Sequence, residues 1–197
     1  MTLKEMKIKT FSLIEEYYPS EKKLAEDEDV INKINGIINQ IQLDLMKYRK
    51  INSYEEIEIK ENDNKIIELS DYISDLYQVK TIYFEKDVLY QMPNDDTIIL
   101  PSDFTGKFKV YYYKYPKMIK VTFNNESEYL KEDTEYNFEL DNILLEIMPY
   151  GIAADLLKMD MISNYGKYFY ERYLEMKNNI DSRKTSGQIV IEGGFDV

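Results

Sequence analysis

The chain has 197 residues, a formal net charge of −12 and a hydrophobic fraction of 44%. This length suits one domain, or one domain with an insertion, and the apolar content is enough for a folded core. The absence of cysteine and histidine excludes disulfides, thiolate metal sites, cysteine nucleophiles and every Ser-His-Asp triad. The acidic balance argues against wrapping the outside of DNA, which requires lysine and arginine.

Residues 1–52 are predicted to form helices. A helix over residues 1–18 places apolar side chains on one side and ends before Pro19. A second helix over residues 28–49 repeats apolar residues every three or four positions, at Ile31, Ile34, Ile38, Ile41, Leu45 and Tyr48. Gly36 costs a helix about 1 kcal/mol relative to alanine, so its presence suggests a close contact between helices.

Residues 53–147 are predicted to be rich in β-strands. The clearest strand runs from Gly106 to Pro116, with one face formed by Phe108, Val110 and Tyr112 and the other by Lys107, Lys109 and Tyr111. Other short strands are predicted over residues 54–60, 66–69, 79–90, 97–100, 119–123 and 138–140. This spacing indicates a small antiparallel sandwich or barrel. Residues 66–72 also resemble residues 98–104, by chance or by duplication.

Helices are predicted to return over residues 148–182 as a helical hairpin. Pro149 suits the first position of the first helix, and Ser163 or Asn164 suits the cap of the second. The second helix carries an apolar and aromatic seam, formed by Tyr165, Phe169, Tyr173, Met176 and Ile180.

Residues 183–197 are predicted to form an extended C-terminal arm. Two interpretations remain open, a frayed terminus and a strand that is added to the sheet of another subunit. Under the second, the predicted partner-binding residues are Gln188, Ile189, Val190, Ile191 and Phe195.

No catalytic, cofactor or metal motif stands out. The chain has no P-loop, no GxGxxG and no HExxH, and the acidic run at residues 26–29 lacks the EF-hand pattern. The 37 carboxylates leave a hydrolytic pair open, although no specific pair stands out. The 19 tyrosines suit surfaces that become interfaces. A carboxylate-dependent, glycan-cleaving hydrolase and a tyrosine-rich adhesion module are therefore the alternatives to a structural role.

Several sequence runs, in this order, are similar to those of one known family. They are residues 34–41 in the second helix, 100–104 and 111–116 in the β-rich region, and 148–157 and 164–173 in the last helices. Together they resemble the head–tail connector (adaptor) proteins of tailed bacteriophages. The resemblance covers most of the chain but rests on no invariant catalytic signature, and Ser70 stands where such chains often have proline.

The resemblance implies an α+β fold, a helical bundle with an antiparallel β-rich domain inserted between the N-terminal and C-terminal helices. It implies a structural, non-enzymatic protein without a cofactor, located at the virion neck and in the host cytoplasm during assembly. About twelve copies would form a ring below the portal protein and offer a platform to tail or stopper proteins. Genome DNA would pass through the channel without specific binding. The chain has no apolar run of about 18 residues, so no membrane contact is expected.

Overall fold

The computed structural model describes residues 1–14, 28–121, 133–159 and 165–180. Helices and antiparallel strands are both present, so the predicted α+β class is confirmed. The helices are α1 (Leu3–Leu13), α2 (Glu28–Leu45), α4 (Asn142–Leu156) and α5 (Tyr165–Asn178), with short 3-10 turns η1 (Leu69–Asp71) and η2 (Leu157–Met159). The strands are β1 (Ile51–Ile59), β2 (Ile66–Glu68), β3 (Leu76–Phe84), β4 (Thr97–Ile99) and β5 (Gly106–Lys114).

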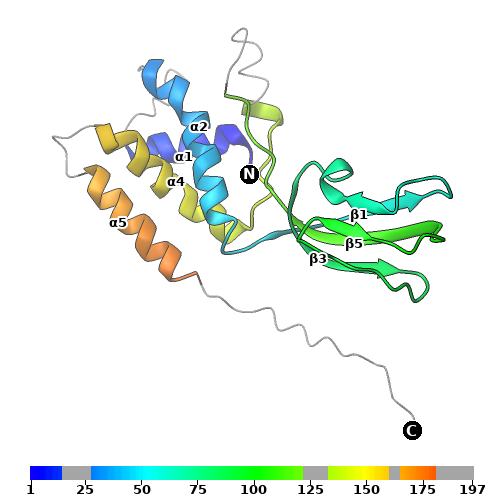
Figure 1. Cartoon of the computed structure of the whole chain (residues 1–197). Coiled ribbons are helices and arrows are strands. Elements are labelled where there is room, and N and C mark those ends of the chain that lie inside the picture. The colour runs from blue at the N-terminus through cyan, green and yellow to red at the C-terminus, as the bar shows by residue number, and fades with distance from the viewer. Residues whose placement is uncertain (15–27, 122–132, 160–164, 181–197) are drawn as a thin grey trace.

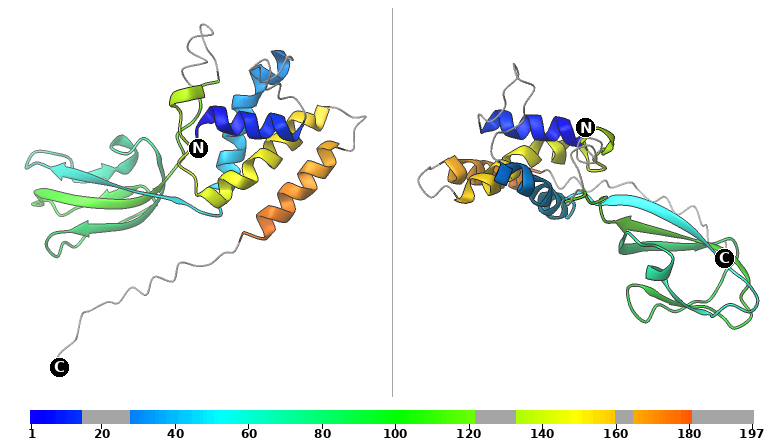
Figure 2. Two further views of the ribbon diagram at one scale, coloured as in Figure 1. Left: turned by 180° about the vertical axis from the view of Figure 1, so that it is seen from behind. Right: turned by 90° about the horizontal axis from the view of Figure 1, so that it is seen from above.

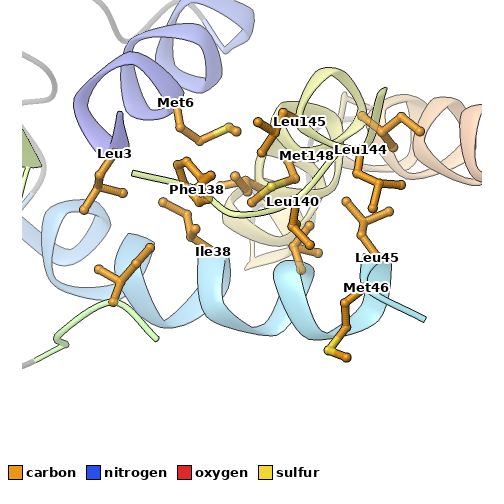
Figure 3. Packing of buried hydrophobic residues seen from close by; sticks show 14 of the residues in the cluster. Leu3, Met6, Ile38, Leu45, Met46, Phe138, Leu140, Leu144, Leu145 and Met148 are labelled. Atoms are coloured by element: carbon orange, nitrogen blue, oxygen red, sulfur yellow. The ribbon is translucent and has the colours of Figure 1, made fainter. Parts of the chain in front are cut away.

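The helices of both chain ends share one apolar core. Helix α1 begins with a capping box, in which Thr2 and Glu5 each accept a hydrogen bond from the other's backbone N–H. Helix α4 contacts α1, α2 and α5, and side chains from α1, α2, α4 and residues 136–140 meet between them (Figure 3). None of the helices in the described ranges is both long and apolar enough to cross a membrane.

The strands form two layers with a second apolar core. The larger sheet is antiparallel with the order β1-β5-β3, and β2 pairs with β4 in a separate two-stranded sheet. Phe108, Val110 and Tyr112 of β5 are buried against residues of the smaller sheet such as Ile67 and Ile98. The larger sheet extends away from the helices on one side of the molecule (Figures 1 and 2).

The alternation predicted for the strand after Gly106 is confirmed. Phe108, Val110 and Tyr112 are buried, whereas Lys107 and Tyr111 are exposed and Lys109 is half-buried. The strand predicted over residues 79–90 begins and ends earlier in the structure. It is β3, which runs from Leu76 to Phe84, and residues 87–90 form no strand. The two similar segments pair with each other, Ile66 opposite Ile99 and Ile67 opposite Ile98.

Two predicted strands are wrong. Of the strand predicted over residues 119–123, residues 122–123 lie outside the described ranges and residues 119–121 form no strand. Side chains of α2 bind the backbone there: Asn39 contacts both the N–H and the C=O of Ile119, at 2.8 Å each, and Asn35 donates to the C=O of Lys120. Residues 138–140 are not a strand either, and the N–H of Phe138 donates to the C=O of Met1 beside an isolated bridge between Thr2 and Asn137. In both places the backbone groups find a partner outside a sheet.

The predicted start of the C-terminal helices at Pro149 is also wrong. Asp141 caps α4 by accepting a hydrogen bond from the N–H of Ile143 at 2.8 Å, so the helix begins at Asn142 and Pro149 lies inside it. The boundary predicted between residues 147 and 148 therefore falls within α4. The predicted helix over residues 1–18 ends at Leu13, with residues 15–18 outside the described ranges, and the helix over residues 28–49 ends at Leu45. The caps predicted at Ser163 or Asn164 also lie outside the described ranges.

The close helix contact suggested for Gly36 lies at Gly151 instead. A Cβ at Gly36 would meet no atom of the described residues within 4 Å. At Gly151, in α4, a Cβ would come within 2.9 Å of the ring of Tyr173 and 3.1 Å of the side chain of Ile41. The missing side chain of Gly151 therefore lets α4 pack closely against both α2 and α5.

Candidate interaction surface

The outer side of the larger sheet carries tyrosines and lysines in register. Tyr54 of β1 lies opposite Tyr111 of β5, with ring centroids 5.9 Å apart. In the next rows towards the far end, Lys109 lies between Glu56 and Tyr83, and Lys107 lies opposite Glu58. We define the tyrosine face as the outward residues of this sheet and its first turn: Lys50, Asn52, Tyr54, Glu56, Glu58, Gln78, Lys80, Thr81, Tyr83, Lys107, Lys109, Tyr111 and Tyr113.

Tyr113 holds two lysine side chains at the end of this face nearest the helices. The Nζ of Lys50 lies 4.8 Å from the ring centroid of Tyr113, and that of Lys80 lies 5.8 Å away. Lys50 also donates to the Oε1 of Gln78 at 2.6 Å. The negative face of an aromatic ring attracts cations, so this arrangement keeps both lysines on the sheet surface.

The opposite side of the β region is acidic. Ile67 and Ile98 of the smaller sheet point to the core, so their neighbours Ile66 and Glu68 point outward and are exposed. We define the acidic side as exposed residues of β2, of η1 and of the loop before β4: Ile66, Glu68, Asp71 and Asp96. These residues and the tyrosine face lie on the two outer surfaces of a two-layer structure.

Ion pairs join the β region to the residues just before α4. Lys114, at the end of β5, donates to Glu139 at 2.7 Å, and Glu139 also accepts from the N–H of Lys117 at 3.1 Å. Burial alone would raise the pKa of Glu139, but these two hydrogen bonds hold it below its ordinary value of 4.5. Arg49, just before β1, binds Asp141 at 2.9 Å. Both chain crossings between helices and sheet are thus held to residues 139–141.

A second polar cluster joins α2 to α5. Asp44 accepts hydrogen bonds from the hydroxyl of Tyr173, at 2.7 Å, and from the ammonium of Lys177. Burial alone would raise the pKa of Asp44, but these partners lower it below its ordinary value of 3.8. Burial, followed by the hydrogen bond to Asp44, raises the pKa of Tyr173. The hydroxyl therefore stays protonated and continues to donate.

These two clusters predict a loss of stability in acid. The pKa values of Asp44 and Glu139 are lowered by folding, so their contribution is complete above the ordinary values of 3.8 and 4.5 and is lost as the pH falls through the lower folded values. We expect the double variant Asp44→Asn/Glu139→Gln to lose less unfolding free energy than the wild type between pH about 6 and pH about 3 in urea titrations. Glu61→Gln/Asp71→Asn, at two exposed carboxylates, is the control. Equal pH dependence of the wild type and the first variant would contradict the assignment.

An open cavity of about 720 Å³ lies at the far end of the sheet. Its lining includes Phe84, Leu89 and Phe104 together with the carboxylates of Glu85, Asp87 and Asp103, all three of which are exposed. A general acid in a hydrolase is usually buried in an apolar environment that raises its pKa. Within the described ranges, no group of three or more histidine, cysteine, aspartate or glutamate side chains is arranged to hold a metal ion.

The predicted partner-binding residues Gln188, Ile189, Val190, Ile191 and Phe195 lie outside the described residues. Sequence reasoning placed Lys107, Lys109 and Tyr111 on one face but missed the contacts of Lys50 and Lys80 with Tyr113 and the acidic opposite side. The alternation of side chains along a strand predicts that Lys107, Lys109 and Tyr111 share a face. The contacts of Tyr113 and the position of the acidic side depend on which strands pair. Compared with known protein families and with curated proteins, the chain gives no match.

Proposed function

We propose that this chain is a structural protein of a bacteriophage neck, a head–tail connector that forms a ring of about twelve copies below the portal protein. The ring extends the DNA channel and offers a platform to tail or stopper proteins. The free protein is located in the host cytoplasm during assembly and afterwards at the head–tail interface. It acts without catalysis and without a cofactor.

The arrangement of two cores along one chain carries this proposal. Helices from both ends of the chain share one core, and the strands between α2 and α4 form another. We infer a helical bundle with an inserted antiparallel β domain, the arrangement implied by the resemblance to connector proteins. An insertion of this kind gives a ring subunit one part for the ring wall and another for contacts beyond it.

The charge of the chain supports a role beside DNA without specific binding. The net charge is −12, and like charges across a wet channel repel within a Debye length of roughly 8–10 Å. An acidic channel wall would let DNA slide. The two alternative functions have less support. A glycan-cleaving hydrolase needs a buried general acid, whereas Glu85, Asp87 and Asp103 at the far cavity are exposed. An adhesion module does not require a second core.

The proposal is tested by imaging the full-length chain mixed with the portal protein from the same genome. We expect negative-stain images to show rings of about twelve copies attached to the portal, because heterologous contacts close into a ring where the rotation between subunits allows it. The portal alone and the chain alone are the controls. Absence of any complex with the portal, together with cleavage of a glycan, would contradict the proposal.

Truncation of the C-terminal arm gives a separate prediction. We expect a chain that lacks residues 186–197 to keep its melting temperature and to form fewer rings with the portal, since a β-forming arm suits strand addition to a neighbour. Differential scanning calorimetry and the same imaging measure the two effects. A fall in melting temperature as large as that of a core variant would show that the arm belongs to the core of its own subunit.

A further inference from the structure

The tyrosine face is more basic than the rest of the chain. Its lysines are Lys50, Lys80, Lys107 and Lys109, against only Glu56 and Glu58 among its carboxylates. Glu56 is already neutralised by Lys107, with 2.8 Å between the Nζ and the Oε1. In a chain of net charge −12, this face is an exception and attracts an acidic surface.

The acidic side supplies such a surface on the same domain. Its carboxylates are Glu68, Asp71 and Asp96, and its defined residues include no lysine. The exposed side chain of Ile66, at 53%, adds an apolar contact there. On the tyrosine face, Tyr54 is 61% exposed and Tyr83 is 56% exposed. Each surface therefore combines charge with exposed apolar area, and the charges are opposite.

The positions of the two surfaces determine what they can assemble. They lie on opposite sides of a two-layer structure, so one copy can present its tyrosine face to one neighbour and its acidic side to another. This contact is heterologous, and a heterologous contact repeats until it closes into a ring or continues as a filament. An isologous dimer, by contrast, would bring two tyrosine faces and their lysines together.

We propose that the tyrosine face of one copy docks on the acidic side of the next copy. The inference rests on the proposed ring assembly and names a contact by which its subunits meet. Lys80 and Lys109 meet carboxylates such as Glu68 and Asp71, and Tyr54, Tyr83 and Tyr111 cover the apolar area between them. A nucleic acid strand is a poorer occupant, because neutralising its phosphates needs many lysines and arginines and the chain has a net charge of −12.

Charge reversal on each surface tests the contact. The front variant is Lys80→Glu/Lys109→Glu and the back variant is Glu68→Lys/Asp71→Lys, all at outward positions of the sheets or of η1. Lys4→Glu/Lys158→Glu, at exposed positions of the helical part, changes the charge by the same amount as the front variant and is the matched control. Circular dichroism establishes that every variant keeps the wild-type fold.

The readout is carbodiimide cross-linking of an equal mixture of unlabelled and nitrogen-15-labelled chains, with and without the portal protein. Mixed-isotope peptides identify links between copies. We expect wild-type chains to link lysines of the tyrosine face to carboxylates of the acidic side, and either variant alone to give at least about tenfold fewer such links. The matched control keeps the wild-type yield.

Mixing the front and back variants provides the decisive arm. Each contact in an alternating assembly then joins surfaces of opposite charge, so we expect mixed-isotope links and portal-bound rings to return. Rings that form equally well with the front variant alone would overturn the docking contact while leaving the connector function standing. Links between the two surfaces without rings on the portal would support the docking contact and contradict the connector function.

Two further outcomes would overturn the docking contact. One is a set of links that joins tyrosine faces only to each other, which indicates an isologous pair. The other is binding of an oligothymidylate probe by the wild type that the front variant loses and the matched control keeps, which assigns the face to single-stranded nucleic acid.

Discussion

Replacing Phe108 by alanine should lower the free energy of unfolding of the β region by about 3–5 kcal/mol. Phe108 is only 2% exposed, and its ring stacks on Phe84 with centroids 5.2 Å apart. Truncation leaves a cavity in a small core that cannot easily collapse. Because the two cores share no buried residue among those that the structure describes, we expect amide hydrogen exchange to accelerate in β5 while the amides of α2 and α4 stay protected.

Tyr111 provides the matched control for this prediction. It lies on the same strand three residues later but faces outward with 39% exposure, and its ring lies 5.9 Å from the ring of Tyr54. We expect Tyr111→Ala to cost less than about 1 kcal/mol, since it removes one partly exposed aromatic pair. An equal loss of stability at both positions would show that the two faces of the sheet are not packed as described.

Alanine at the two helical glycines should have opposite effects. Gly151→Ala places a methyl group 2.9 Å from the ring of Tyr173, and we expect it to destabilise the helical core by about 1–3 kcal/mol through overpacking. Gly36→Ala adds a methyl group with no described atom within 4 Å, so the better helix propensity of alanine should stabilise the protein by about 1 kcal/mol.

Urea unfolding of the two glycine variants and the wild type measures both effects. The pair is its own control, because each variant makes the same chemical change in a helix. A neutral or stabilising result at Gly151 would mean that α4 and α5 can separate at no cost. Tyr173→Phe separates crowding from the polar cluster, since it removes the hydroxyl bound to Asp44 without removing the ring.

The parts of the fold that depend on neighbouring residues could be predicted from the sequence. The alternation in β5 and the apolar spacing of α2 specify most of their buried faces directly. Both elements begin where they were predicted, but α2 ends at Leu45, and Tyr48 of the predicted stripe is exposed. The predictions were wrong where residues distant in the sequence determine the local structure. Residues 119–121 have the composition of a strand, but Asn35 and Asn39 of α2 bind their backbone. Such a contact is set by packing and has no local signature.

The interaction surface was predictable only in part for the same reason. Strand alternation placed Lys107 and Tyr111 together, but the lysines around Tyr113 come from a turn before β1 and from an irregularity in β3. The start of α4 shows the opposite case, because Asp141 is a good local cap that lies eight residues before the predicted start at Pro149. The capping preference of aspartate was available in the sequence and outweighs the preference of proline.

The attachment of the sheet through residues 139–141 has a mechanical consequence. Asp141 both caps α4 and binds Arg49. Glu139, two residues before Asp141, forms an ion pair with Lys114. A rotation of the sheet about its two connections would have to stretch these ion pairs and, through Asp141, pull on the first turn of α4. Torque applied to the sheet is therefore transmitted directly to α4, the helix that contacts α1, α2 and α5.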